Sequence, residues 1–141
     1  ARTVGAGKIS KDAQALIDVT RNALSAGIDA AQAGGWVRDI GAAIEKVVPK
    51  RFGIIETFCG HGVGYALHEE PIIPNFVMPG KSHQLKPGMV LAIEPMITLG
   101  GIDVEILEDG YTAITKDGSL AAHMEHTVLI TEDGPEILTL V

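Results

Sequence analysis

The first third of the chain carries hydrophobic residues at the spacing of helices. A segment rich in helix-forming residues begins after Ser10, a favoured N-cap residue, and continues to about Ala30. Two glycines after Ala33 interrupt this pattern. The next stretch carries one apolar stripe at helical spacing, formed by Ile40, Ala43, Ile44 and Val47. The pattern predicts two core-packing helices, the second of which ends before Pro49.

After Gly53 the pattern changes to short apolar runs separated by turn residues. We expect a short strand at 54–58, a proline-rich loop at 71–86 and an apolar strand at 89–95. Further strands are expected around 102–107, 111–115, 124–131 and 136–140, with Asp-Gly turns at 109–110, 117–118 and 133–134. Helices followed by turn-linked strands predict an α+β fold with a mostly antiparallel sheet, in a single domain over residues 1–141.

Composition and charge narrow the classes of partner. The formal net charge of -7 disfavours a nucleic acid or an anionic membrane, each of which needs a basic face. No apolar run approaches the ~20 residues that span a bilayer. The single cysteine, Cys59, excludes an internal disulfide and a multi-cysteine zinc site. Since the first residues also lack the apolar core of a signal peptide, we expect a cytoplasmic protein.

Two glutamates stand inside apolar, strand-like runs. Glu94 lies within VLAIEPMI and Glu125 within MEHTVLI. A carboxylate buried there without a partner costs several kcal/mol. Each glutamate could instead lie on the solvent-facing side of its strand or at the solvent-exposed end of that strand. Two such glutamates, together with histidines in a glycine turn, favour a shared cation.

His61 is flanked by glycines, which permit positive φ angles and close backbone approach. An ordinary turn is the alternative. The glycine spacing does not match a dinucleotide-binding fingerprint, because Tyr65 stands where the third glycine should fall. The residue four places after His68 is Ile72, so the zincin motif is also absent.

The residues themselves therefore predict a metal site made of His61, Glu94 and Glu125. One imidazole with two carboxylates suits Mn, Fe, Co or Zn. Three protein ligands leave coordination positions open for water, as in catalytic sites. His68 would remain free to polarise a carbonyl group or to move a proton.

Three motifs in order carry a family resemblance: CGHGVGYALHEEP, LKPGMVLAIEPMI and HMEHTVLITEDGPEILTL. From about Ile9 to the end, the chain resembles type I methionine aminopeptidases of the creatinase or pita-bread fold. The residues that follow the two motif glutamates differ from those usual in prolidases and Xaa-Pro aminopeptidases. The resemblance implies half of a pita-bread fold, with two helices packed on a curved, mostly antiparallel sheet.

The resemblance also implies roles for individual residues. By position, His61 and Glu94 bind one metal ion, Glu125 bridges two, and His68 contacts the scissile carbonyl or the tetrahedral intermediate. Residues of the substrate pocket are expected at Cys59, Leu67 and Tyr111. Leu67 stands where many members have phenylalanine and Tyr111 where tryptophan is usual, so the pocket keeps an apolar wall of altered shape.

The implied activity is a metal-dependent aminopeptidase that removes the N-terminal methionine from nascent proteins. A metal-bound hydroxide attacks the peptide carbonyl, while metal and a histidine stabilise the oxyanion. The implied partner is a peptide or a nascent-protein N-terminus. Two alternatives are a non-catalytic protein-binding module of the same fold and an enzyme similar to Xaa-Pro peptidases or prolidases.

The resemblance covers only the C-terminal half of the family's catalytic domain. The family holds two metal ions with five ligands, two of which are aspartates on a hairpin upstream of the position of His61. Here the upstream aspartates lie on or beside the predicted helices: Asp12, Asp18, Asp29 and Asp39. We therefore expect at most one metal ion and little or no activity from this chain alone, with a missing N-terminal half or a second copy completing the site.

Overall fold

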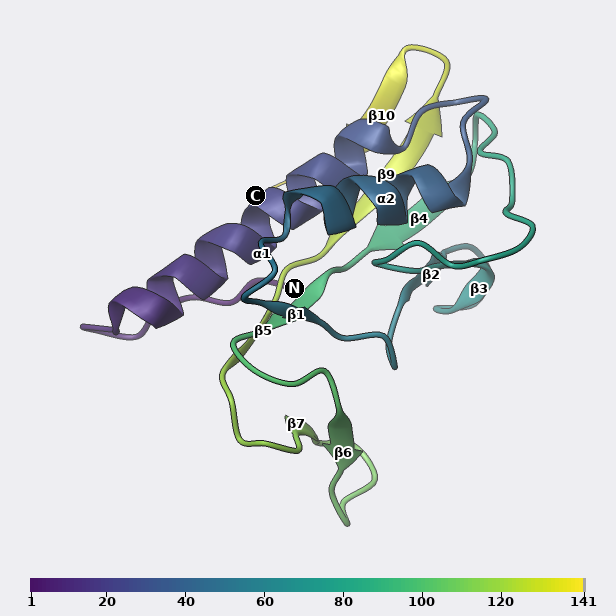
Figure 1. The fold of residues 1–141 in the computed structure, drawn as a ribbon. Helices are drawn as coiled ribbons and strands as arrows, with labels where there is room; N and C mark the ends of the chain where they lie inside the picture. The colour runs from purple at the N-terminus through teal and green to yellow at the C-terminus, as the bar shows by residue number, and fades with distance from the viewer. Residues whose placement is uncertain (141) are drawn as a thin grey trace.

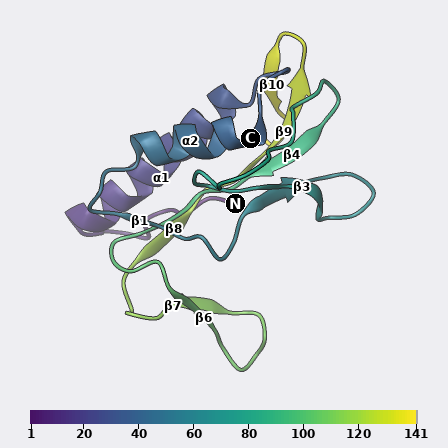
Figure 2. The same cartoon turned by 45° about the vertical axis from the view of Figure 1, so that its right-hand side comes forward.

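Two helices form one layer of the molecule and antiparallel strands form the other (Figures 1 and 2). The computed structural model describes residues 1–140, so Val141, the last residue of the predicted domain, lies outside it. Helix α1 spans Lys11–Ala30, and the Ser10 hydroxyl accepts a hydrogen bond from the Ala13 N–H at 3.1 Å. The predicted N-cap and both ends of this helix are confirmed.

Helix α2 spans Val37–Val47 and packs beside α1 (Figure 1). The Asp39 carboxylate accepts a hydrogen bond from the Trp36 N–H at 2.8 Å and so caps the first turn. Ile40 and Ile44 are fully buried, as the apolar stripe predicts. Val47 is 40% exposed, because it is the last residue of the helix and lies beyond the core.

Within residues 1–140, ten short strands form three sheets, and every pairing among them is antiparallel, in agreement with the predicted mostly antiparallel sheet. The five-stranded sheet has the order β10-β9-β4-β2-β3, the second sheet has the order β1-β5-β8, and β6 pairs with β7. The strands are β1 Gly53–Ile54, β2 Gly60–Gly62, β3 Glu69–Ile73, β4 Val90–Ile93, β5 Met96–Thr98, β6 Val104–Ile106, β7 Ala113–Thr115, β8 Ala121–His123, β9 His126–Thr131 and β10 Gly134–Ile137.

Several predicted strand boundaries are wrong. The strand expected at 54–58 is reduced to Gly53–Ile54, and the strand expected at 136–140 runs instead from Gly134 to Ile137. The run at 124–131 begins only at His126, and a strand at 121–123 precedes it. Pairing with distant segments sets these ends, and local sequence carries little information about that pairing. The three Asp-Gly turns are confirmed, each with a glycine at positive φ.

The main core lies between the helices and the five-stranded sheet. Its fully buried strand residues are Ile73 of β3, Leu91 and Ile93 of β4, and Val128 and Ile130 of β9. Because side chains alternate along a strand, Ala92 and the residue after Ile93 project from the opposite face of β4. Glu94 and, from the neighbouring strand β2, His61 lie on that side of the sheet. Within residues 1–140, neither helix combines the length and the apolar character needed to cross a bilayer.

The β6–β7 hairpin projects away from the helices (Figure 2) and is tied at its base by Asp117. This carboxylate accepts hydrogen bonds from the Gly101 N–H at 2.7 Å and from the Ser119 N–H at 3.0 Å. These bonds, the one from Gly101 foremost, lower the pKa of Asp117 from 3.8 to about 2. The charged carboxylate therefore stabilises the base of the hairpin.

Replacing Asp117 with asparagine should lower the unfolding temperature near neutral pH but not in strong acid. Because the folded-state pKa lies below the unfolded-state value, the carboxylate stabilises the fold above about pH 4, and this contribution is lost as the pH falls toward 2. Thermal unfolding of both proteins at about pH 7 and about pH 2 measures the difference. Asp133→Asn, in another Asp-Gly turn, is the control. An Asp117→Asn effect of equal size at both pH values would contradict the assignment.

Candidate metal centre

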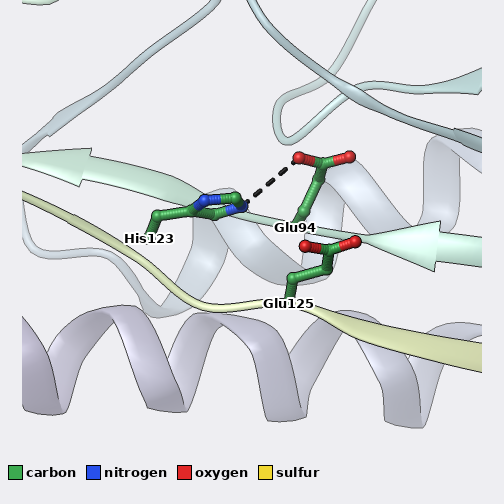
Figure 3. Close-up of side chains that lie close together, drawn as sticks. All are labelled: Glu94, His123 and Glu125. Carbon is green, nitrogen blue, oxygen red and sulfur yellow. Dashed lines mark ion pairs between the residues drawn. The ribbon is translucent and has the colours of Figure 1, made fainter. Parts of the chain in front are cut away.

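Glu94 and Glu125 lie at two strand breaks that face each other (Figure 3). Strand β4 pairs with β9 up to Ile93, and β5 pairs with β8 from Met96 onward, in the same register on both sides of the gap. Pro95 lies at the break and has no N–H to donate to a ladder. The unbroken register places Glu94 opposite Glu125.

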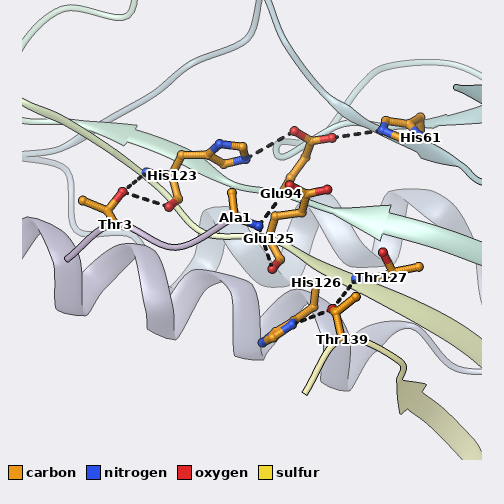
Figure 4. A network of polar contacts seen from close by, with 9 residues as sticks. All are labelled: Ala1, Thr3, His61, Glu94, His123, Glu125, His126, Thr127 and Thr139. Atoms are coloured by element: carbon orange, nitrogen blue, oxygen red, sulfur yellow. Dashed lines mark hydrogen bonds and ion pairs between the residues drawn. The ribbon is translucent and has the colours of Figure 1, made fainter. Parts of the chain in front are cut away.

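Glu94 lies between two imidazoles (Figure 4). Its Oε1 is 3.4 Å from the Nε2 of His61, and its Oε2 is 3.3 Å from the Nε2 of His123. The Glu94 side chain is only 14% exposed, so the alternative of a solvent-facing glutamate does not hold for this residue. The Glu125 side chain is 29% exposed, and its Oε2 lies 3.1 Å from the amino group of Ala1.

The position of His61 follows from strand pairing. His61 lies opposite Ala92, and Ala92 and Glu94 share one face of the chain, so the imidazole reaches the carboxylate. The His61 Nδ1 is 2.9 Å from the carbonyl oxygen of Gly62. Because a carbonyl only accepts, Nδ1 carries the hydrogen and Nε2 is the nitrogen directed at Glu94. Histidine ligands of metals are commonly oriented by such a bond.

The glycines beside His61 are required by close backbone approach and not by a positive φ. Neither Gly60 nor Gly62 has a positive φ. A Cβ at Gly60 would lie 2.2 Å from the Ala92 carbonyl oxygen, and one at Gly62 would lie 2.3 Å from the Glu70 carbonyl oxygen. Strand β2 therefore fits between β3 and β4 only with glycine at both positions.

One ligand atom each from Glu94, His123 and Glu125 lies within 4.8 Å of the others (Figure 3). His123 is not among the site residues predicted from the sequence. The available signal was its spacing: His123 and Glu125 are separated by one residue in a largely apolar run. Imidazole nitrogen and carboxylate oxygen suit a divalent transition metal, and a cation between them relieves the repulsion between facing lone pairs. The residues present therefore fit a divalent metal ion.

Of the remaining predicted site residues, His68 and Cys59 lie near this cluster, whereas Leu67 and Tyr111 are exposed on loops. The ring of His68 packs edge-on against that of His61, with 4.3 Å between ring centroids. Cys59 is partly buried, and burial, with a further contribution from the Glu94 carboxylate, raises the pKa of its thiol. Leu67 and Tyr111 are 73% and 92% exposed, in the β2–β3 loop and at the tip of the β6–β7 hairpin.

Comparisons with known proteins identify the family of this chain. The profile of Metallopeptidase family M24 matches residues 1–132. A methionine aminopeptidase of Clostridium perfringens is 46% identical over the whole chain, which spans 57% of that protein. The chain thus spans about half the length of the curated relatives it matches.

Solved structures give the same result for the fold. The crystal structure of a methionine aminopeptidase from Thermotoga maritima superposes with a TM-score of 0.91 at 45% identity, over 96% of this chain and 55% of that one. An Xaa-Pro dipeptidase from Bacillus anthracis superposes with a TM-score of 0.73 at 22% identity, over 99% of this chain and 34% of its own. At this low identity, the match to the Xaa-Pro dipeptidase shows a shared fold and nothing about function.

Proposed function

Since this chain belongs to metallopeptidase family M24, we propose that it forms the C-terminal half of the catalytic domain of a methionine aminopeptidase. The observation that carries the proposal is that Glu94 and Glu125 face each other at two strand breaks, with the His61 imidazole 3.4 Å from Glu94. The similarity to methionine aminopeptidases at 45–47% identity supports this substrate class over the Xaa-Pro peptidases.

We assign the metal to His61, Glu94 and Glu125, with Mn, Fe, Co or Zn as the candidates. When bound, such a metal polarises a peptide carbonyl and activates water. The largely buried carboxylate of Glu94 would bind the metal with one imidazole on either side of it. This arrangement argues against a purely protein-binding module, which has no need of a carboxylate in a largely buried position.

His68 would act on the substrate. It is exposed beside His61, so its imidazole can donate a hydrogen bond to the carbonyl oxygen of a bound peptide. Cys59, Leu67 and Tyr111 would line the pocket for the methionine side chain. The thiol of Cys59 stays protonated at neutral pH, since burial raises its pKa, and so suits an apolar wall.

The proposed partner is the remaining half of the catalytic domain. Several apolar side chains of the projecting hairpin are exposed, among them Ile106, Leu107 and Ile114. Exposed apolar groups gathered on one element commonly mark an interface. A second copy of this chain is the alternative partner, and the substrate would be the N-terminus of a peptide or a nascent protein.

The 141-residue chain alone should show little or no turnover of a Met-Ala-Ser peptide with Mn or Co added. It supplies only part of the ligand set that the family resemblance implies. Release of free methionine, compared with the intact Thermotoga maritima enzyme under the same conditions, measures this. Turnover comparable to the intact enzyme, abolished in Glu94→Gln, would support the aminopeptidase but contradict the proposal that this chain is an incomplete half.

A further inference from the structure

The imidazole of His123 lies at the metal centre but is not among the three ligands assigned there. Its Nε2 is buried and has no hydrogen-bond partner among residues 1–140, although it lies 3.3 Å from Glu94 Oε2. Buried polar atoms in proteins nearly always have a partner. An orphaned nitrogen beside two carboxylates calls for an explanation.

The backbone holds His123 firmly in this position. Its N–H donates to the Thr3 hydroxyl at 2.9 Å, and the same hydroxyl donates to the His123 carbonyl oxygen at 2.9 Å. Thr3 N–H donates to that carbonyl as well, at 3.1 Å. The end of strand β8 is therefore fixed, and the ring is directed at Glu94 by the fold (Figure 4).

We infer that His123 is a further metal ligand, whose Nε2 binds the same ion as Glu94 Oε2 and Glu125. This inference rests on the proposed metal centre. Two ligands of one ion at bond lengths of about 2.0 to 2.2 Å lie at most about 4.4 Å apart. The three ligand atoms lie within 4.8 Å of one another, so small side-chain adjustments bring them around one ion.

Charge and geometry separate this role from that of His61. The two carboxylates, one of which also lies 3.1 Å from the Ala1 amino group, attract a divalent cation, and His123 offers it a nitrogen ligand. His61 faces Oε1 of Glu94, whereas His123 faces Oε2, so each carboxylate oxygen has its own imidazole. His123 therefore adds a nitrogen ligand on the side of Glu94 that His61 does not face.

The test compares His123→Gln with His83→Gln, a matched control at an exposed histidine outside the cluster. Glutamine keeps a polar side chain at this position but is a weak metal ligand. We expect His123→Gln to weaken Zn²⁺ binding by the 141-residue chain by about tenfold or more in calorimetry, and His83→Gln to have no effect. X-ray absorption of the Zn²⁺-loaded chain should show one imidazole fewer in His123→Gln only.

A measurement on the unmodified chain removes any dependence on variant folding. On addition of Zn²⁺, the imidazole ¹⁵N resonance of His123 Nε2 should shift, while those of His83 should not. Unchanged affinity and imidazole count in His123→Gln, or an unshifted His123 resonance, would overturn the inference. If Glu94→Gln alone loses binding, the proposed metal centre stands without His123; if neither variant loses binding, the centre itself is wrong.

Discussion

Replacing Glu94 with glutamine should abolish divalent metal binding by this chain. The Glu94 carboxylate lies between His61 and His123 and opposite Glu125, so it is the group that all other candidate ligands share. Glutamine keeps the shape of the glutamate side chain but removes its negative charge. Its NH₂ group also replaces one of the two carboxylate oxygens that could bind the metal. Since loss of an outer-shell partner alone costs metal sites about 10- to 100-fold in affinity, loss of this ligand should cost at least about 100-fold. Isothermal calorimetry with Mn²⁺, Co²⁺ or Zn²⁺ measures the effect.

Thermal unfolding provides an independent readout of the same change. A metal at a free concentration of about 100 times its dissociation constant stabilises the folded state by about 2.7 kcal/mol. The unmodified chain should gain this stabilisation, whereas Glu94→Gln should gain almost none. Glu136→Gln, at an exposed carboxylate on β10, should respond like the unmodified chain. Metal stabilisation of Glu94→Gln equal to that of the unmodified chain would favour a non-catalytic binding module.

The sequence was most informative where one residue contradicts its surroundings. Glu94 and Glu125 could be identified because a carboxylate is costly in an apolar run. Their facing positions could not be identified, because these depend on the register of β4 with β9 and of β5 with β8. His123 was overlooked for a related reason: because strand β8 was not predicted, the one-residue spacing between this histidine and Glu125 did not reveal that both approach one carboxylate.

The same contrast applies to the fold. The helices follow local rules, since Ser10 caps α1 and Ile40 and Ile44 form the buried face of α2. Strand ends depend on distant partners: β1 is limited to the two residues that pair with Ile97 and Thr98 of β5. The roles of Leu67 and Tyr111 come from the resemblance alone and stay predictions, since both side chains are largely exposed in the described residues.

Replacing Gly60 with alanine should destabilise the fold and weaken metal binding together. The new Cβ would lie 2.2 Å from the Ala92 carbonyl oxygen and 3.2 Å from the Ile73 Cβ, so β2 must move away from β4. Overpacking of this kind costs about 1 to 3 kcal/mol. Because the pairing of β2 with β4 sets the 3.4 Å contact between His61 and Glu94, the movement should also separate these two ligands. Chemical denaturation and metal calorimetry on the same protein measure both effects.

Gly64→Ala is the matched control, since it adds the same methyl group to the same glycine-rich segment. Its Cβ would meet the Glu69 carboxylate, the far end of a flexible side chain that can rotate away. We therefore expect Gly64→Ala to change stability and metal affinity little. If Gly60→Ala were equally mild, close packing of β2 would not be what positions His61, and the flanking glycine would be explained better as part of an ordinary turn. A large effect at Gly60 alone would mean that the fold holds His61 against Glu94 through the contact between two backbones.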